Sequence, residues 1–476
     1  MSKAIFWFRK DLRLEDNPGL TYACQNHDEV LFIYIQDEPL QALQAKAQSW
    51  WLHHSLVALE QSLQTHHLKL VFKQGEPEAI LSECIKQHDI SAVYWNRCYE
   101  PQTINRDQHL KSTFKEQGII VKSFNASLLN EPWEVKNQQG LPFKVFTPFW
   151  KQCLKQIQMR PAETIKYWPK NIDCSSENIS DWQLLPTTPN WADLFPSYWI
   201  PGEKGAQEKL KNFLIQGVHQ YKDGRDQPAL KATSNLSPHL HFGEIGPWDI
   251  FRTLSEYNLH HPEHETHVLH FLSELGWREF SYYLLYHFPK LPTENFKSEF
   301  NAFPWHADTK AFERWTKGQT GYPIIDAGMR ELWRTGTMHN RVRMIVASFL
   351  IKDLFIDWRE GAAWFEKTLL DADLASNSAS WQWVAGCGAD AAPYFRIFNP
   401  ILQGAKFDPE GKYVRRFVPE LANLPTDYLF SPWEAPAHVL AQAGVTLGKT
   451  YPKPIVDHGE ARAHALAAFQ SLKAAA

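Results

Sequence analysis

Cysteine is scarce in this chain. The 476 residues include six cysteines, and no two of them form a C-x-x-C pair. Structural zinc sites, iron–sulfur clusters and disulfide frameworks depend on closely spaced cysteines. None of the three is expected, and no metal site is predicted.

Long apolar runs and an excess of positive charge are also missing. The first residues, MSKAIFWFRKDLRL, carry charges where a secretion signal would be apolar, and no run is long enough to span a bilayer. The net charge of −4 argues against a positive coat over the whole surface but allows a local basic groove. We expect a cytoplasmic protein without a membrane or an obligate partner, most simply a monomer.

Short β-branched and aromatic runs alternate with helical patterns in the N-terminal part. The alternation predicts a Rossmann-like α/β domain, a parallel sheet with helices on both faces. The turn after the first run reads RKDLRLEDN and lacks G-x-G-x-x-G, so a nicotinamide dinucleotide site is not supported. The five runs begin at Ala4, Val30, Leu68, Ser91 and Gly118.

The composition and the apolar periodicity of the sequence change at two further places. Residues 131–200 are rich in Pro, Trp, Asn and Ser with weak periodicity, which indicates a linker. Residues 201–476 carry apolar spacings of three and four. We therefore predict an α/β domain over 1–130, a linker over 131–200 and an all-α domain over 201–476.

Two stretches of the helical half place unusual polar groups together. The TSNLS sequence at residues 233–237 offers hydroxyls and an amide before a helix, which suits either a diphosphate or a plain N-cap. Further on, Glu274, Trp277 and Arg278 share one side of a helix. That side fits either a solvated ion-pair stripe or the recognition of an extruded base.

Two later stretches suggest a pocket and a basic patch. Asn340, Arg341, Arg343 and Met344 lead into an apolar helix, where polar groups need partners. From Asp371 onward, acidic and amide groups are followed by Trp381, Trp383 and a run of small residues that lets the backbone approach a planar ligand. Residues 396–417 then hold five basic side chains against two acidic ones, as a DNA-binding groove requires.

Long motifs in a fixed order resemble signatures of the photolyase/cryptochrome family. They are FWFRKDLRLEDNPGL at 6–20, TGYPIIDAGMREL at 320–332, MHNRVRM at 338–344 and WQWVAGCGADAAPYFRIFNP at 381–400. The resemblance implies an N-terminal domain for an antenna chromophore and a helical domain that binds FAD and DNA. It also implies light-dependent repair of cyclobutane pyrimidine dimers, by electron transfer from photoexcited reduced FAD to a flipped-out dimer.

The resemblance also implies roles for individual residues. Arg343 would pair with Asp371, and Asn377 would hydrogen-bond the flavin N5. The expected FAD contacts are Tyr221, Thr233, Ser234, Asn235, Leu236, Ser237, Arg278, Arg343, Asp371, Ala372, Asp373 and Asn377. Those expected on DNA are Arg225, Glu274, Trp277, Asn340, Arg341, Met344, Trp383 and Gln403. Trp381, Trp358 and Trp305 resemble the tryptophan route that reduces an oxidised flavin; with Asn377 and Glu274 they make up the expected catalytic set.

The resemblance leaves three choices to make. Asn340 stands where enzymes for (6-4) photoproducts have a second histidine, which favours cyclobutane dimers. The rival functions are a cryptochrome-type photoreceptor, which predicts a long C-terminal extension, and a flavoprotein that binds DNA without repair. The stretch AKAQSWWLHHSL at 45–56 resembles the plant-cryptochrome-like photolyase branch, and Gly276 and Thr337 replace bulkier residues. The antenna expected is methenyltetrahydrofolate, with 8-hydroxy-5-deazaflavin as the alternative and Glu100 as a contact.

Overall fold

The computed structural model describes residues 2–391 and 395–475, so residues 392–394 of the motif at 381–400 lie outside the described part. The chain divides into two compact units. The first unit comprises residues 1–219, 234–289 and 370–373, and the second comprises residues 220–233, 290–369 and 374–476. Each unit is described by itself.

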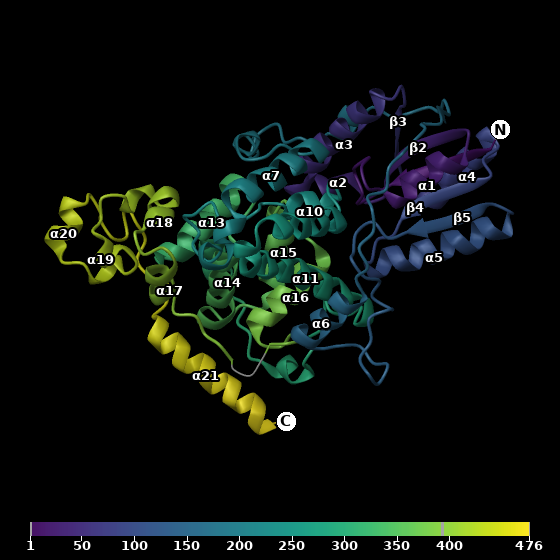
Figure 1. Ribbon diagram of the computed structural model, residues 1–476. Helices are drawn as coiled ribbons and strands as arrows, with labels where there is room; N and C mark the ends of the chain where they lie inside the picture. Colours follow the sequence, from purple (N-terminus) through teal and green to yellow (C-terminus); the bar gives the residue numbers. More distant parts are fainter. Residues whose placement is uncertain (1, 392–394, 476) are drawn as a thin grey trace. The chain divides into compact units, whose positions relative to one another are not determined.

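The first unit contains a parallel sheet (Figure 1). Its main path runs in the order β3-β2-β1-β4-β5, and the short strand β6 pairs with β2. The crossovers on both sides of β1 match the doubly wound arrangement that strand–helix alternation predicts. The strands are β1 Lys3–Phe8, β2 Glu29–Gln36, β3 Leu70–Gln74, β4 Ala92–Asn96, β5 Ile120–Phe124 and β6 Lys170–Asn171.

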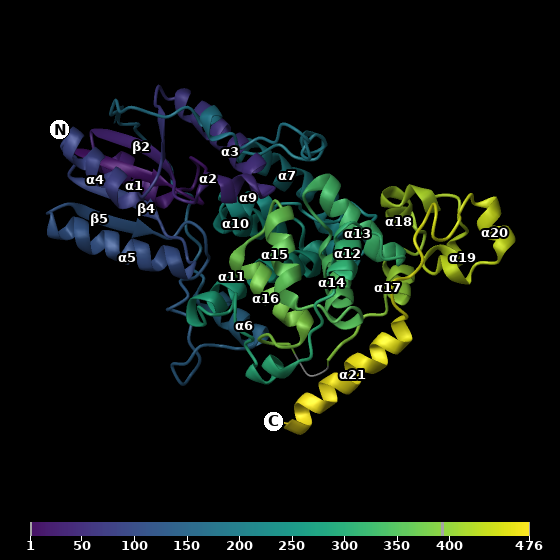
Figure 2. The same cartoon turned by 180° about the vertical axis from the view of Figure 1, so that it is seen from behind.

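The two faces of the sheet bury alternate residues of each strand. In β1, Phe6 and Phe8 pack with residues of helices α1 and α3, whereas Ile5 and Trp7 pack with residues of α4 and α5 on the other face. Helix α5 lies beside β5 in the view from behind (Figure 2). These helices span α1 Pro18–Asn26, α3 Gln48–Gln64, α4 Pro77–His88 and α5 Pro101–Glu116.

The first unit also contains helices outside these four. Helix α11 packs against both α6 and α10. The helices are α2 Leu40–Gln44, α6 Phe146–Gln156, α7 Glu203–Gln216, α9 Ser237–Phe242, α10 Pro247–His260 and α11 Glu265–His287.

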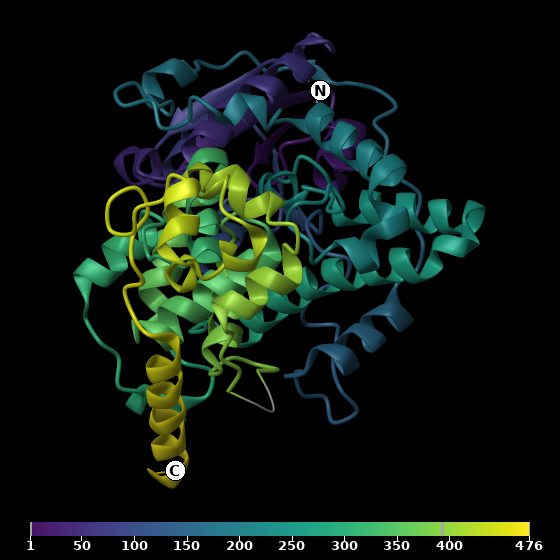
Figure 3. The ribbon, with the colours of Figure 1, turned by 90° about the vertical axis from the view of Figure 1, so that its left-hand side faces the viewer.

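Among its described residues, the second unit consists of helices joined by loops and contains no strand. Its last helix, α21, is the yellow helix beside the C label in Figure 3. It is held by a hydrogen-bonded pair between His458 Nδ1 and Asp353 Oδ1 at 2.6 Å, and by Phe469 stacked on Phe395. The helices are α8 Tyr221–Gly224, α12 Thr309–Thr316, α13 Pro323–Thr335, α14 Asn340–Ser348, α15 Trp358–Thr368, α16 Leu374–Ala385, α17 Pro400–Phe407, α18 Lys412–Phe417, α19 Thr426–Leu429, α20 Ala437–Gln442 and α21 His458–Ala475.

The predicted fold class is confirmed: all five predicted strands form the parallel sheet, and the C-terminal half is helical. The short strand β6 and helix α6 were missed. Helix α6 lies inside the stretch predicted as a linker, and it buries Phe149, Trp150 and Cys153. Within the described residues, no helix has both the length and the hydropathy of a membrane span.

Candidate functional site

Asp373 lies in a buried polar network of the first unit. The Tyr282 hydroxyl donates a hydrogen bond to its carboxylate, and His241 Nδ1 lies 3.8 Å from the same oxygen. Burial alone would raise the pKa of this carboxyl. The nearby His241, Lys10 and Arg278 side chains outweigh burial and hold the pKa of this carboxyl well below its usual value. Asp373 is therefore an ionised acceptor in a protein interior.

The segment around Asp371 is fixed by two hydrogen bonds from distant parts of the first unit. The Ser237 hydroxyl donates to the Asp371 carboxylate, and Gln48 Nε2 donates to the Ala372 carbonyl at 2.7 Å. Asn235, just before α9, has φ of 53°, in the left-handed region that Asn tolerates better than most residues. The segment 234–237 thus brings the Ser237 hydroxyl to a buried carboxylate.

Trp277 on α11 presents a flat aromatic surface. Its ring stacks on Phe146 of α6 with centroids 3.9 Å apart and planes 10° from parallel. Glu274 lies on the same helix, three residues earlier, and is partly buried. A Cβ on Gly276 would lie 2.6 Å from the Trp150 ring, so the glycine allows α6 to approach closely. This contact explains the small residue at position 276.

A small cleft in the first unit contains Glu100. The carboxylate accepts a hydrogen bond from Lys10 Nζ, and Arg278 Nη1 donates to the Ser127 carbonyl at 2.7 Å. Burial would raise the pKa of Glu100, but the charge and hydrogen bond of Lys10 lower it. The cleft is lined by Lys10, Cys98, Tyr99, Glu100, Ser127, Leu240, His241, Arg278 and Tyr282.

Two arginines of the second unit share one carboxylate. Arg341 makes a bidentate contact with Asp226, at 2.8 Å from Nη2 and 3.3 Å from Nε. Arg225 Nε lies 4.0 Å from Asp226, and its guanidinium carbon lies 5.5 Å from the centre of the buried Tyr221 ring. Thr233 ends the same short stretch of the second unit and is partly buried.

The start of α14 carries further residues that the sequence analysis predicts to contact DNA or FAD. Arg341 Nη1 lies 3.8 Å from the sulfur of Met344, while Asn340 is exposed. Arg343 donates to the Met338 carbonyl at 2.6 Å and to the Thr337 hydroxyl at 3.3 Å. Thr337 thereby helps to orient Arg343, and the helix start carries both positive charge and a polarisable thioether.

The three tryptophans of the predicted route belong to the second unit. Trp381 on α16 and Trp358 on α15 are buried, and Trp305 is partly exposed. Helices α15 and α16 pack against each other, and a Cβ on Gly361 would lie 2.2 Å from the Trp381 ring. Asn377 on α16 donates from its amide to the Ala362 carbonyl of α15 at 3.0 Å.

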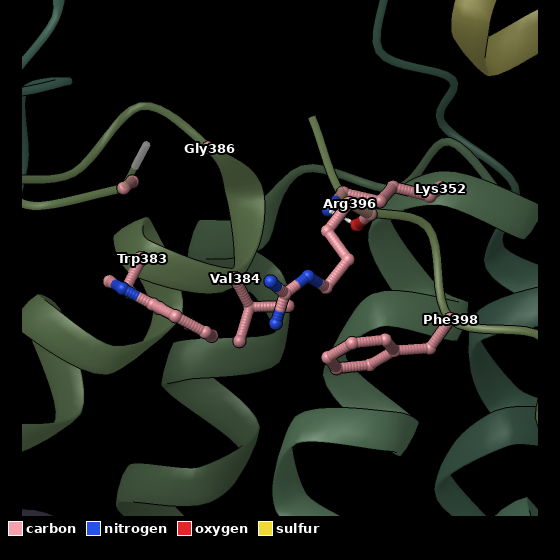
Figure 4. A pocket seen from close by; sticks show the side chains of 7 residues that line it. Lys352, Trp383, Val384, Gly386, Arg396 and Phe398 are labelled. Carbon is pink, nitrogen blue, oxygen red and sulfur yellow. Dashed lines mark hydrogen bonds between the residues drawn. The ribbon is translucent and has the colours of Figure 1, made fainter. Parts of the chain in front are cut away.

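Trp383 lines a pocket of the second unit (Figure 4). The Arg396 side chain extends toward Val384 and Trp383 in this view, and Phe398 lies on the other side of the guanidinium. Lys352 Nζ donates to the Arg396 carbonyl and lies 4.6 Å from the centre of the Phe395 ring. Burial lowers the pKa of Lys352 to about 7. Gln403 is partly buried on α17.

Several neighbours of the predicted residues were not found from the sequence. Phe146 lay in a region predicted to be a linker, and Gln48 is separated from its partner by more than 300 residues of chain. Two of these neighbours could have been found from the sequence. Asp226 directly follows the predicted DNA contact Arg225, and Lys352 is a charged residue inside the apolar run FLIKDLF. Sequence spacing cannot identify contacts between distant elements.

The polar side chains around Asp371 and Asp373 in the first unit fit the polar parts of FAD. An ionised Asp373 and the Asp371 carboxylate can accept hydrogen bonds from ribose hydroxyls and ring N–H groups. The Ser234 hydroxyl can donate to a phosphate oxygen, whereas the Ser237 hydroxyl already donates to Asp371.

Comparisons with known proteins identify related sequences over the whole chain. A sequence model for the FAD binding domain of DNA photolyase matches residues 271–471, and a model for DNA photolyase matches residues 4–169. A deoxyribodipyrimidine photo-lyase of Agrobacterium fabrum is 50% identical, over 98% of this chain and 98% of the relative. Cryptochrome-2 of Arabidopsis thaliana is 38% identical, over 97% of this chain and 77% of the relative.

A solved structure has the same fold. The crystal structure of a bacterial class III photolyase from Agrobacterium tumefaciens superposes with a TM-score of 0.95 at 49% identity, covering 99% of this chain and 98% of the other. The chain therefore belongs to the photolyase/cryptochrome family.

Proposed function

We propose that this protein is a deoxyribodipyrimidine photolyase, an enzyme that uses light to repair cyclobutane pyrimidine dimers in DNA. The observation that carries the proposal is the match to a deoxyribodipyrimidine photo-lyase at 50% identity over 98% of both chains. Identity to the Arabidopsis cryptochromes is lower, at 38%. Repair is therefore favoured over the photoreceptor alternative.

FAD is the cofactor, held by the FAD-binding domain. When bound and reduced, FAD would supply the light-driven electron transfer that splitting of the cyclobutane ring requires. The proposed contacts are the residues named above for FAD. Tyr221 and Thr233–Ser237 would bind the phosphates and ribose. Asp371–Asp373, Arg278 and Arg343 would surround the ribose and flavin edge. The Asn377 amide would face N5, where it can pair with the flavin in more than one protonation state without adding charge.

The proposed dimer-binding residues combine stacking surfaces with polar groups. Trp277 has one ring face covered by Phe146, and Trp383 lines a pocket. Stacking contributes about 1–3 kcal/mol per base, which offsets an extrusion cost on the order of a few kcal/mol. Glu274, Asn340 and Met344 would contact the dimer and set its orientation.

The DNA backbone would be held by positive charge. Arg225 and Arg341 are the proposed phosphate contacts, with Gln403 as a further contact and the basic stretch 396–417 supplying additional charge. Because phosphate contacts release counterions, binding should weaken as salt rises.

The proposed route for electrons to an oxidised flavin runs from Trp305 through Trp358 to Trp381. Two features support it: Trp358 and Trp381 are buried on packed helices, and Trp305 is partly exposed to solvent, where a reductant can reach it.

The antenna, the domain division and the assembly state also belong to the proposal. Methenyltetrahydrofolate is the preferred antenna, with 8-hydroxy-5-deazaflavin as the rival; the cleft around Glu100 supports a contact there. The division into residues 1–130, 131–200 and 201–476 stays a prediction. A monomer in the cytoplasm stays the expected form.

The test uses oligonucleotides that carry one defined lesion. Pre-reduced protein is illuminated with blue light, and the products are separated by chromatography. We expect a thymine dimer to return to two thymines in the light and to persist in the dark, while a (6-4) photoproduct persists in both. A dimer that survives illumination would contradict the enzyme assignment, and repair of the (6-4) lesion would contradict the choice of target.

A further inference from the structure

Three side chains with metal-binding atoms meet at the turn between α10 and α11 of the first unit. Figure 1 labels these two helices. His261, Glu263 and His264 each offer one ligand atom, and these atoms lie within 4.8 Å of one another. All three residues are at or beside the short 3-10 turn Pro262–His264. Their side chains are 45%, 60% and 27% exposed, so an ion can reach them from solvent.

The spacing of these atoms is close to that of a tetrahedral metal site. Zinc–ligand bonds of about 2.0–2.1 Å at tetrahedral angles place neighbouring ligand atoms roughly 3.3 Å apart. The distance from His261 Nδ1 to Glu263 Oε1 is 3.4 Å, and that from His264 Nε2 to the same oxygen is 4.0 Å. Small rotations of exposed side chains would close the remaining difference.

Surrounding contacts hold the imidazoles in this arrangement. Tyr257 Oη lies 2.8 Å from His264 Nδ1. When Nδ1 carries the proton and donates it to Tyr257, the lone pair of Nε2 is available on the side of Glu263. This resembles the outer hydrogen bonds that orient histidines in metal sites. The Tyr257 ring also packs on His261 at 4.4 Å and on His264 at 5.9 Å between centroids.

The backbone of the turn is fixed as well. The His261 N–H donates to the Tyr257 carbonyl at the end of α10, and the His264 N–H donates to the His261 carbonyl, both at 3.0 Å. Pro262 between them restricts φ. Two imidazoles and a carboxylate therefore project from a closed turn, which reduces the entropy lost when an ion binds.

We propose that His261, Glu263 and His264 bind one zinc ion, with water completing the coordination. Two imidazole nitrogens and one carboxylate oxygen form a ligand set that zinc accepts. The bound ion would join the end of α10 to the start of α11. Cysteine spacing in the sequence could not reveal this site, because its ligands are two histidines and a glutamate.

The competing explanation is a set of solvated ion pairs that bind no metal. Titration calorimetry of the purified full-length protein with zinc chloride, in a buffer that does not chelate zinc, distinguishes the two. We expect one strongest site per chain. Its affinity should fall at least tenfold in His261→Ala, in His264→Ala and in Glu263→Gln. Tyr257→Phe should weaken it about tenfold, because only the orienting hydroxyl is lost.

His260→Ala is the matched control, since this exposed histidine is adjacent in the sequence but outside the group. It should leave the titration unchanged, and all variants should keep the wild-type circular dichroism. Equal affinity and stoichiometry in the wild type and the His261→Ala/His264→Ala double variant would overturn the proposal, as would the absence of any zinc binding by the wild type. Because Glu263→Gln changes an exposed side chain, it tests the site even if a histidine variant folds poorly.

Discussion

The two arginines proposed to bind DNA phosphates have an acidic neighbour in common. Asp226 pairs with Arg341 at 2.8 Å and lies 4.0 Å from Arg225. A phosphate must compete with this carboxylate, so Asp226 should weaken binding to any DNA. Undamaged DNA has no flipped dimer whose binding could compensate for that competition. The carboxylate should therefore increase the preference for dimer-containing DNA over undamaged DNA.

Replacement of this carboxylate by its amide tests the idea. We expect Asp226→Asn to bind undamaged duplex several-fold more tightly than the wild type at low salt, measured by fluorescence anisotropy. Asp223→Asn removes the same charge from an exposed position of α8 and serves as the control. If both variants bind equally tightly, net charge and not the arginine pair would account for the change.

Trp305 is the proposed entry point for electrons from solvent. Trp305→Phe should slow photoreduction of the oxidised flavin by at least tenfold and leave repair by pre-reduced enzyme unchanged. The two rates are measured separately, by absorbance under illumination with an external reductant and by chromatography of repaired oligonucleotide. Equal loss of both rates would show that Trp305 does not serve as this entry point.

At the scale of elements, the contact between α6 and α11 holds the proposed dimer-stacking surface. Gly276 allows the approach, since an added Cβ would lie within 2.6–2.9 Å of three Trp150 ring atoms. Gly276→Ala should lower stability by roughly 1–2 kcal/mol, the overpacking cost reduced by the better helix propensity of alanine. Melting temperature reports the change. Ser273→Ala on the same helix should cost less, and a Gly276→Ala protein as stable as the wild type would contradict the packing argument.

A second contact of α11 should make stability depend on pH. Burial raises the pKa of Glu279 to about 7, although the backbone N–H groups of Leu129 and Asn130 donate to its carboxyl. The folded state thus binds this proton more tightly than the unfolded state, where the reference pKa is 4.5. The resulting stabilisation is complete below the unfolded value and is lost as pH rises toward 7, by an amount on the order of 3 kcal/mol.

Glu279→Gln removes this titration. The melting temperature of the variant relative to the wild type should rise between about pH 5 and pH 8. Glu265→Gln, exposed in the first turn of the same helix, should show no such trend. A constant difference between Glu279→Gln and wild type over this range would contradict the assignment.

Considered as a whole molecule, the chain was most predictable where its patterns are local. The five strands follow from short β-branched and aromatic runs, and α11 and α14 follow from apolar spacing of three and four. Helix α6 was missed because its apolar residues, Phe149, Trp150 and Cys153, stand among the prolines and asparagines of a stretch that otherwise reads as a linker. Its helical state depends on packing against α11, which sequence patterns do not contain.

The roles assigned to the site residues stay predictions. Motifs identified the residues expected to contact FAD and DNA, because the polar and aromatic side chains are clustered in the sequence. The partners that orient them come from elsewhere: Gln48 holds Ala372, Tyr282 holds Asp373, and Phe146 covers Trp277. Such partners are found only when distant segments are seen together in space.

The account depends on a flavin carried by this chain. The most direct measurement is the visible absorption spectrum of the purified protein, followed by denaturation and identification of the released chromophore. We predict flavin absorbance with close to one FAD per chain, bleached when blue light is given with an electron donor. A colourless protein that releases no flavin and gains none when incubated with FAD would contradict the account.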